Sequence, residues 1–249
     1  IDVQWGNHDI VWMGAMMGSA VCISVVLANN LKYENTEFLE EGYGISLRNL
    51  EHFANSNYSG KNITERMYKA ISVIRFKLED KLMLSEKEFS MQEKTRLDKI
   101  NFKNMTWKGY KLNTDEFPTV DENNPFELTQ DEKKVVDGLI HSFKNSDKIK
   151  KHLNFMFSKG SIYLCYNGNL LYHGCVPIDE NGEFHLVLDE TEFPYECPIA
   201  SQHMKFNDDF LTVTFDVWKK LISNPLVFDF VEMDSRLRDE RTRNYEIVI

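Results

Sequence analysis

The first residues of the chain show a strand pattern followed by a helix pattern. Apolar and polar residues alternate over Ile1–Trp5, and this period of two predicts a short β-strand. The polar stretch Gly6–Asp9 predicts a turn, and the next 19 residues, Ile10–Ala28, carry no charge. We expect this run to form one buried helix packed against a sheet. A strand, a polar turn and a helix in this order commonly present functional side chains at the carboxyl end of the strand.

The uncharged run also fits a second interpretation. By length alone, Ile10–Ala28 matches a transmembrane helix, and Gly14 and Gly18 have the G-x-x-x-G spacing of helix dimers. However, Ser19 and Ser24 join these glycines in making the run only moderately apolar, and no Lys or Arg precedes it. We therefore favour the buried helix and expect no membrane partner.

Helical periodicity dominates residues 31–158. Asn62 or Thr64 can cap a helix that carries apolar residues at helical spacing, namely Met67, Ile71, Ile74 and Leu78. The pattern Ser90-Met91-Gln92-Glu93 is that of a capping box, and it predicts a helix through residues 96–100. We expect residues 31–158 to form a mostly helical insertion.

A second capping box opens another predicted helix within this insertion. Thr129 is followed three residues later by Glu132, the spacing at which the two side chains can cap each other's backbone N–H groups. The apolar face of the helix that follows comprises Val135, Val136, Leu139, Ile140 and Phe143.

The pattern changes from helical to strand-like near residue 160. Asn167-Gly168 separates the aromatic-rich runs Ser161–Tyr166 and Asn169–His173, which is the signal of a hairpin with a type I′ turn. A turn over 179–182 and a strand over 184–188 follow. We accordingly assign residues 1–30 and 159–190 to a common core.

The last part of the chain has weaker patterns. Residues 216–222 have the spacing of an amphipathic helix, and residues 234–243 form a mixed charge run typical of a solvated segment. Residues 191–249 therefore stay an unassigned tail.

Composition and charge narrow the class of protein. The 249 residues include 29 Lys and Arg against 39 Asp and Glu, which gives a net charge of −10. This is ordinary globular composition, and its acidity argues against a nucleic-acid partner. No signal peptide is visible, and the four cysteines contain no C-x-x-C pair, so we expect reduced thiols and a cytoplasmic location. Sequons at Asn57, Asn62 and Asn104 are attributed to chance.

Gly6-Asn7-His8-Asp9 is the first candidate for chemistry. Asn7 offers a neutral amide oxygen to a cation, and His8 offers a general acid that titrates near neutrality. Asp9 can orient that pair. From these four residues alone, a polar turn whose Asn and Asp merely cap the next helix is an equal alternative.

His173 is the second candidate. An imidazole at the end of a strand, followed by Gly174, suits a metal ligand. The alternative is a strand-end histidine bonded to a backbone carbonyl, which is the commoner role of a lone histidine. The other five histidines have weaker contexts: His52, His141, His152, His185 and His203.

Several stretches together resemble one known family. Asp2–Ala15, Glu41–Arg48, Ile74–Glu79, Leu153–Met156 and Tyr166–Pro177 are similar, in this order, to the class III bacterial fructose-1,6-bisphosphatases. These enzymes belong to the calcineurin-like metallophosphoesterase superfamily. The resemblance covers about residues 1–188. It implies an α/β (α+β) fold: a partial βαβαβ sandwich with a large, mostly helical insertion over residues 31–158.

The resemblance also implies roles for the candidate residues. Asn7 and His173 would bind the same metal of a two-metal site, with Mn²⁺ as the usual ion. His8 would protonate the leaving-group oxygen, and Asp9 would support the His8 turn. The implied reaction is hydrolysis of the 1-phosphate of fructose 1,6-bisphosphate in gluconeogenesis, with a sugar bisphosphate as the partner molecule and a homo-oligomer as a candidate assembly.

This sequence departs from the family pattern in three places. It contains neither the D-x-H nor the G-D-x-x-D-R motif of the superfamily, and no Gly-His pair follows His173. We therefore expect an incomplete piece of the enzyme that is inactive alone. Two alternatives remain: a non-catalytic degenerate chain or binding subunit of the same family, and a protein or nucleotide phosphatase of the same superfamily.

Overall fold

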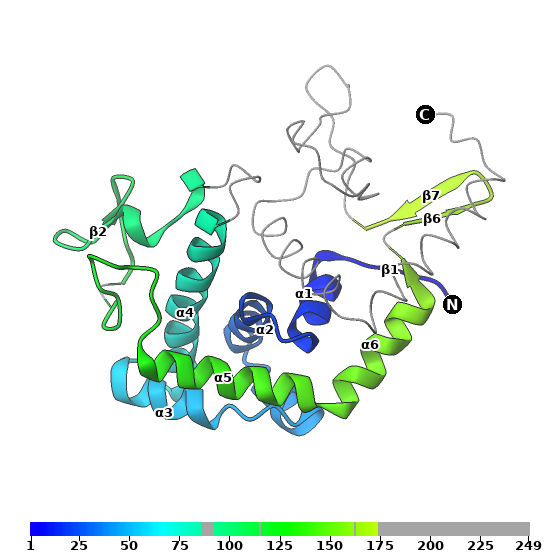
Figure 1. The fold of residues 1–249 in the computed structure, drawn as a ribbon, viewed down its shortest axis with the longest axis horizontal. Coiled ribbons are helices and arrows are strands. Elements are labelled where there is room, and N and C mark those ends of the chain that lie inside the picture. The colour runs from blue at the N-terminus through cyan, green and yellow to red at the C-terminus, as the bar shows by residue number, and fades with distance from the viewer. Residues whose placement is uncertain (86–91, 115, 162, 174–249) are drawn as a thin grey trace, which may run out of the picture.

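The computed structural model describes residues 1–85, 92–114, 116–161 and 163–173. A group of packed helices forms the centre of this part, with one three-stranded sheet at one end and two two-stranded sheets at the other (Figure 1). It is a mixed α/β structure, as the sequence predicts. The expected features over 179–182, 184–188, 216–222 and 234–243 lie outside the described residues, as do His185 and His203.

The predicted first helix is in fact two helices, α1 (Asn7–Met16) and α2 (Ala20–Lys32). The single helix expected over Ile10–Ala28 is therefore wrong, and so is the separate turn over Gly6–Asp9, because α1 already begins at Asn7. The break occurs at Gly18, whose φ of +88° is a left-handed backbone conformation that glycine adopts readily and other residues rarely adopt. Its N–H donates to the Ala15 carbonyl (3.0 Å), and Ser19 N–H donates to the Gly14 carbonyl (2.9 Å), which is a Schellman ending.

The second helix lies at the centre of the core. Every residue of α2 from Val21 to Ala28 is buried, as expected of a helix that is apolar on all sides. Its main neighbours are helices α1, α4 (Ile63–Ser85) and α5 (Gln130–Asn145), so the sheet we expected beside it is not there in the described residues. No helix in the described ranges is long and apolar enough to cross a membrane.

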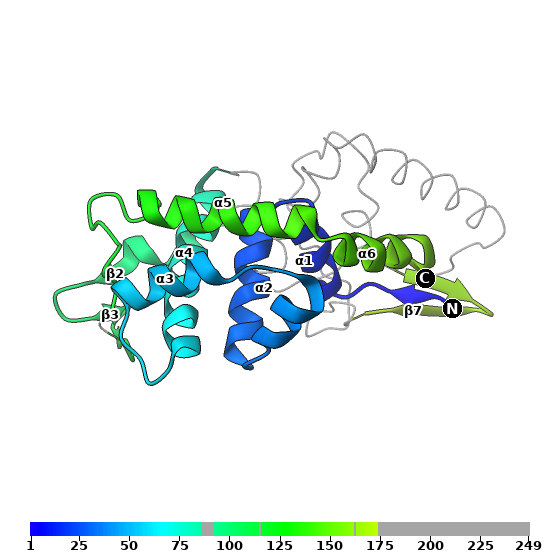
Figure 2. The same cartoon turned by 90° about the horizontal axis from the view of Figure 1, so that it is seen from below.

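The helices of residues 31–158 pack on this centre. Besides α4 and α5 they are α3 (Arg48–Asn57), α6 (Asp147–Lys159) and the π-helical turn η1 (Phe38–Gly42), and Figure 2 shows α5 and α6 in succession along one side. Residues 1–30 and 31–158 thus share one hydrophobic core. Their division into a core and an insertion stays a prediction.

Two helix starts follow their predicted caps. Asn62 Oδ1 accepts the Glu65 N–H (2.8 Å) at the start of α4, and Thr129 and Glu132 cap each other at the start of α5. The apolar faces predicted for both helices are confirmed: Met67, Ile71, Ile74, Val135, Val136, Leu139 and Phe143 are buried, while Leu78 and Ile140 are half-buried.

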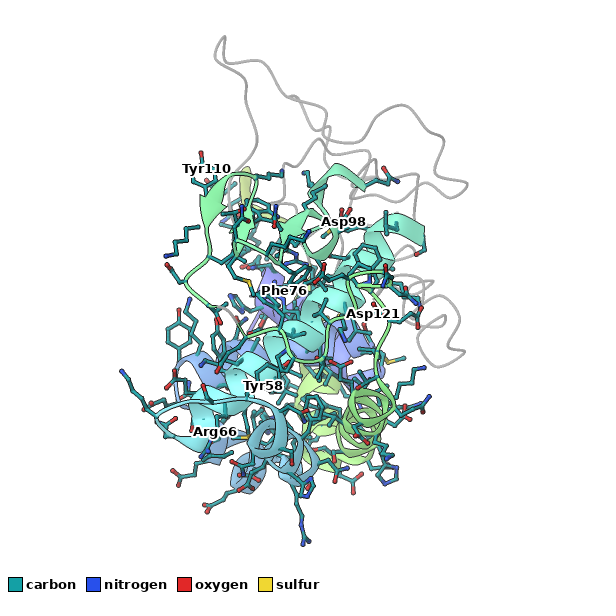
Figure 3. The ribbon with its side chains drawn as sticks, turned by 90° about the vertical axis from the view of Figure 1, so that its left-hand side faces the viewer. Tyr58, Arg66, Phe76, Asp98, Tyr110 and Asp121 are labelled. Carbon is teal, nitrogen blue, oxygen red and sulfur yellow. The ribbon has the colours of Figure 1, made fainter. Side chains whose placement is uncertain are left out.

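The helix expected over residues 96–100 is wrong. Short 3₁₀ turns, η3 (Gln92–Lys94) and η4 (Leu97–Lys99), lead instead into an antiparallel sheet of β2 (Ile100–Asn101), β3 (Thr106–Trp107) and β4 (Tyr110–Lys111). The Asp80 carboxylate accepts the N–H groups of Arg96 and Leu97, which holds this segment against α4 in place of a helical turn. In Figure 3, Tyr110 marks the outer end of this sheet.

The opposite end of the molecule holds the strands next to the candidate residues. The predicted first strand, β1 (Val3–Gln4), pairs in parallel with β5 (Gly160–Ser161). The predicted hairpin is confirmed as β6 (Tyr163–Tyr166) and β7 (Asn169–Tyr172), with positive φ at both Asn167 and Gly168 as a type I′ turn requires. Both views place β1 and this hairpin at the same end as α6 (Figures 1 and 2).

Candidate functional site

Asn7, His8 and Asp9 form the first turn of α1, which begins two residues after β1, with Trp5 and Gly6 between them. The Gly6 N–H donates to Asp9 Oδ2 (2.8 Å), and the Ile10 N–H donates to the Gly6 carbonyl (3.2 Å). Asp9 thereby fastens the junction between strand and helix. Asn7 is half-buried and His8 is exposed, so both side chains are accessible from solution.

His173 lies against this junction. It directly follows β7 and is exposed, and its ring lies beside the backbone of Gly6. A Cβ atom built on Gly6 would lie 2.9 Å from both Cδ2 and Nε2 of His173, closer than real side chains approach. The absence of a side chain at residue 6 therefore leaves the space that the imidazole occupies, one residue before Asn7.

The donor types at this junction fit a divalent metal. Asn7 provides an amide oxygen and His173 an imidazole nitrogen, both suited to Mn²⁺. Within the described ranges, no three His, Cys, Asp or Glu side chains are grouped so as to hold a metal. The assignment of Asn7 and His173 to a metal therefore stays a prediction.

The first turn of α1 adds a preference for negative charge. Backbone N–H groups at a helix N-terminus carry a partial positive charge, equivalent to about half an elementary charge, and favour anions such as phosphate. No Lys or Arg lies between Ile1 and Leu31. The Asp9 carboxylate lies in the same turn and offsets part of this charge, so a bound metal would be the main attraction for an anionic substrate in this segment.

The other described histidines have other surroundings. His141 contacts the Asn145 side chain within α5 (3.2 Å), and His152 Nδ1 lies 3.1 Å from the Tyr43 hydroxyl. His52 is exposed on α3. The sequence did not indicate that Gly6 leaves space for the His173 ring, or that the Trp5 side chain contacts Met156. Both roles depend on residues more than 150 positions away, which only the fold brings close.

Replacing Gly6 with alanine is expected to displace the His173 ring without unfolding the protein. The backbone of Gly6 (φ −95°, ψ 176°) is open to alanine, and an exposed side chain can move away. We expect Mn²⁺ affinity, measured by electron paramagnetic resonance, to fall about 10–100-fold, as when a ligand's support is lost. Gly42→Ala, whose Cβ would have ordinary contacts, is the matched control. Unchanged Mn²⁺ affinity in Gly6→Ala would contradict the arrangement.

Comparison with known proteins bears on the chemistry of this site. Residues 1–193 match the family described as Firmicute fructose-1,6-bisphosphatase, which is most of the chain and includes all four candidate residues. The chain belongs to this fructose-1,6-bisphosphatase family. The resemblance seen in the sequence is thus confirmed.

Curated relatives agree with this assignment. The chain is 47% identical to the class 3 fructose-1,6-bisphosphatase of Clostridium botulinum (strain Okra / Type B1) over 205 residues, covering 73% of this chain and 31% of the relative. It is 45% identical over 211 residues to a class 3 fructose-1,6-bisphosphatase of Clostridium beijerinckii, covering 75% of this chain and 32% of the relative. The chain therefore spans about a third of the length of these relatives. No solved structure matches it.

Proposed function

We propose that this chain forms part of a metal-dependent phosphatase that hydrolyses the 1-phosphate of fructose 1,6-bisphosphate. The observation that carries the proposal is the position of the His173 ring against Gly6, the residue that precedes Asn7 and His8, in a chain of the fructose-1,6-bisphosphatase family. The two segments that meet there are those whose motifs resemble the family's metal site.

Each residue has a distinct role in the proposal. The Asn7 side-chain oxygen and a ring nitrogen of His173 hold one Mn²⁺ of a two-metal site. Bound Mn²⁺ supplies Lewis-acid stabilisation of the charge that develops on the phosphoryl oxygens. His8 donates a proton to the leaving sugar oxygen, and Asp9 keeps the His8 turn fixed through the Gly6 N–H.

The surroundings of the site support these roles. The exposure of His8 and His173 leaves room for a sugar bisphosphate. The parallel pairing of β1 with β5, with α1 following β1 after Trp5 and Gly6, is compatible with a calcineurin-like sandwich, which we retain as part of the proposal. We also retain a cytoplasmic location, with Cys22 as a buried thiol.

The names of the relatives favour a sugar bisphosphate over a protein or nucleotide substrate. A non-catalytic binding subunit remains the second candidate, because the sequence lacks the D-x-H and G-D-x-x-D-R motifs and a Gly-His pair. Two ligands cannot form the two-metal clamp that the chemistry needs. We therefore propose that the 249-residue chain alone has no turnover.

The deciding assay is phosphate release from fructose 1,6-bisphosphate with Mn²⁺, run on this chain and on the full product of its gene. We expect release by the full product and none by the chain alone. AMP and a phosphotyrosine peptide serve as comparison substrates for the two other phosphatase classes. Robust turnover by the chain alone would overturn the incomplete-site account, and failure of a full product that carries the missing motifs would overturn the proposed function.

A further inference from the structure

Trp5 contacts the junction between α6 and β5 through both its backbone and its side chain. Its backbone N–H donates to the Ser161 carbonyl (2.8 Å) and extends the pairing of β1 with β5 by one residue. Its indole Nε1–H donates to the Met156 carbonyl (3.2 Å). One residue thus fastens the first strand of the chain to the segment that leads into the hairpin.

The indole of Trp5 contacts two residues in the last turn of α6, Met156 and Phe157. Met156 lies in the last turn of α6, where carbonyl groups lack a partner within the helix, and the indole N–H satisfies one of them. The indole also packs edge-to-face with Phe157, with ring centroids 6.1 Å apart and an interplanar angle of 85°. These two contacts fix both the position and the orientation of the Trp5 ring.

Gly160 provides the space for this ring. A Cβ atom built on Gly160 would overlap Trp5 Nε1 and lie 2.6 Å from the Met156 carbonyl oxygen. A glycine directly after α6 is therefore required by the close approach of the indole and not by a left-handed backbone, since its φ is −126°. The indole can occupy this position only because residue 160 has no side chain.

Two consecutive residues, Trp5 and Gly6, contact the two ends of the segment from Gly160 to His173. Trp5 contacts the start of this segment at Gly160 and Ser161, and Gly6 contacts its end at His173. Asn7 follows immediately on the same strand-to-helix junction. A shift of β1 relative to β5 would therefore change the separation of Asn7 and His173.

We propose that Trp5, packed against Gly160, is a positioning residue that sets the separation of Asn7 and His173 in the metal site. The inference rests on the proposed function for the metal and on the contacts above for the geometry. Residues that support metal ligands typically contribute about 10–100-fold in metal affinity, and we expect an effect of this size from Trp5.

The test uses the 249-residue chain and two independent measurements. The first is the nuclear Overhauser effect between the Gly6 Hα protons and the His173 ring protons, recorded without metal. The second is Mn²⁺ affinity by electron paramagnetic resonance. The variants are Trp5→Ala, Trp5→Phe, Gly160→Ala and the double Trp5→Ala/Gly160→Ala. Trp107→Phe is the matched control, because Trp107 lies in β3, in the sheet at the other end of the molecule (Figure 1).

We expect the proton contact in the wild type and in Trp107→Phe, and its loss in Trp5→Ala and Gly160→Ala. Trp5→Phe keeps aromatic volume but loses the N–H, so it should retain the fold and still bind Mn²⁺ more weakly. The double variant should be no worse than Trp5→Ala, because the added methyl group no longer meets an indole.

Two results separate this inference from the proposed function. If the proton contact and Mn²⁺ affinity persist in folded Trp5→Ala or Trp5→Phe, Trp5 has no positioning role and the inference is overturned. If the contact depends on Trp5 but neither wild type nor variant binds Mn²⁺, the positioning of His173 by Trp5 is supported, and phosphate release by the full product of the gene then decides the proposed function.

Discussion

Replacing His8 with alanine is expected to lower kcat by about 10²–10⁴-fold while leaving Mn²⁺ affinity unchanged, because a general acid acts on the leaving group in the transition state. His8 is exposed in the first turn of α1, so its replacement should leave the fold intact. The measurement is phosphate release by the full gene product at saturating fructose 1,6-bisphosphate, with Mn²⁺ affinity measured on the same preparation.

His173→Ala is the matching variant with the opposite signature. It removes a proposed metal ligand, so Mn²⁺ affinity should fall and excess Mn²⁺ should restore part of the turnover. In His8→Ala, excess Mn²⁺ should restore nothing. If His8→Ala behaves like His173→Ala in the Mn²⁺ titration, the assignment of an acid and a ligand to these two residues is wrong.

Replacing Glu132 with alanine is expected to lower the free energy of unfolding by about 3–5 kcal/mol, because it leaves a buried charge without its partner. Lys77 and Glu132 are both fully buried, with Lys77 Nζ 2.8 Å from Glu132 Oε2. Glu132 also accepts hydrogen bonds from the Thr119 hydroxyl (2.6 Å) and the Thr129 N–H (2.7 Å). The variant therefore loses an ion pair, a loop contact and half of a helix cap together.

The adjacent residue offers a control for this prediction. Asp131 pairs with Lys134 at 2.8 Å, but both side chains are largely exposed, so Asp131→Ala should leave stability almost unchanged. The double variant Lys77→Met/Glu132→Leu should recover only the part of the loss that comes from the unpaired Lys77 charge, because the Thr119 hydroxyl and the Thr129 N–H still lose their acceptor. Urea unfolding followed by circular dichroism measures all three. Equal stability of Glu132→Ala and Asp131→Ala would contradict the account.

Local signals in the sequence predicted those elements whose cause is also local. The hairpin around Asn167-Gly168 and the caps at Asn62 and Thr129 each depend on residues within a few positions, and all three are confirmed. The break between α1 and α2 was equally local. Gly18 ends α1 and Ser19 caps α2, and both residue types are typical of these positions. The uncharged run from Ile10 to Ala28 nevertheless led us to predict one continuous helix.

Elements held by distant partners could not be predicted in this way. Residues 96–100 follow a capping-box pattern, yet the Asp80 carboxylate on α4 holds Arg96 and Leu97 in a tighter turn. The pairing of β1 with β5 likewise joins residues far apart in the chain. Such contacts depend on the packed structure, and no short window of sequence contains both partners.

The candidate site combines residues that local sequence signals identified and residues whose role depends on distant partners. Asn7, His8 and His173 were identified from their residue types and motifs, and the family match confirms the resemblance that linked them. The supports were not identified: Gly6 leaves space for the His173 ring, and Gly160 leaves space for Trp5. A glycine signals a close approach only when the atom that approaches it is known.

The most direct test of the central claim, that Asn7 and His173 hold one metal, is a Mn²⁺ titration of the isotope-labelled 249-residue chain followed by NMR. Mn²⁺ broadens the signals of nuclei near it, so the method also detects weak binding. We predict that the Asn7 side-chain amide and the His173 ring broaden first and together, while the rings of His52 and His141 are spared. Broadening of only one of the pair, or of His52 and His141 equally, would contradict the account.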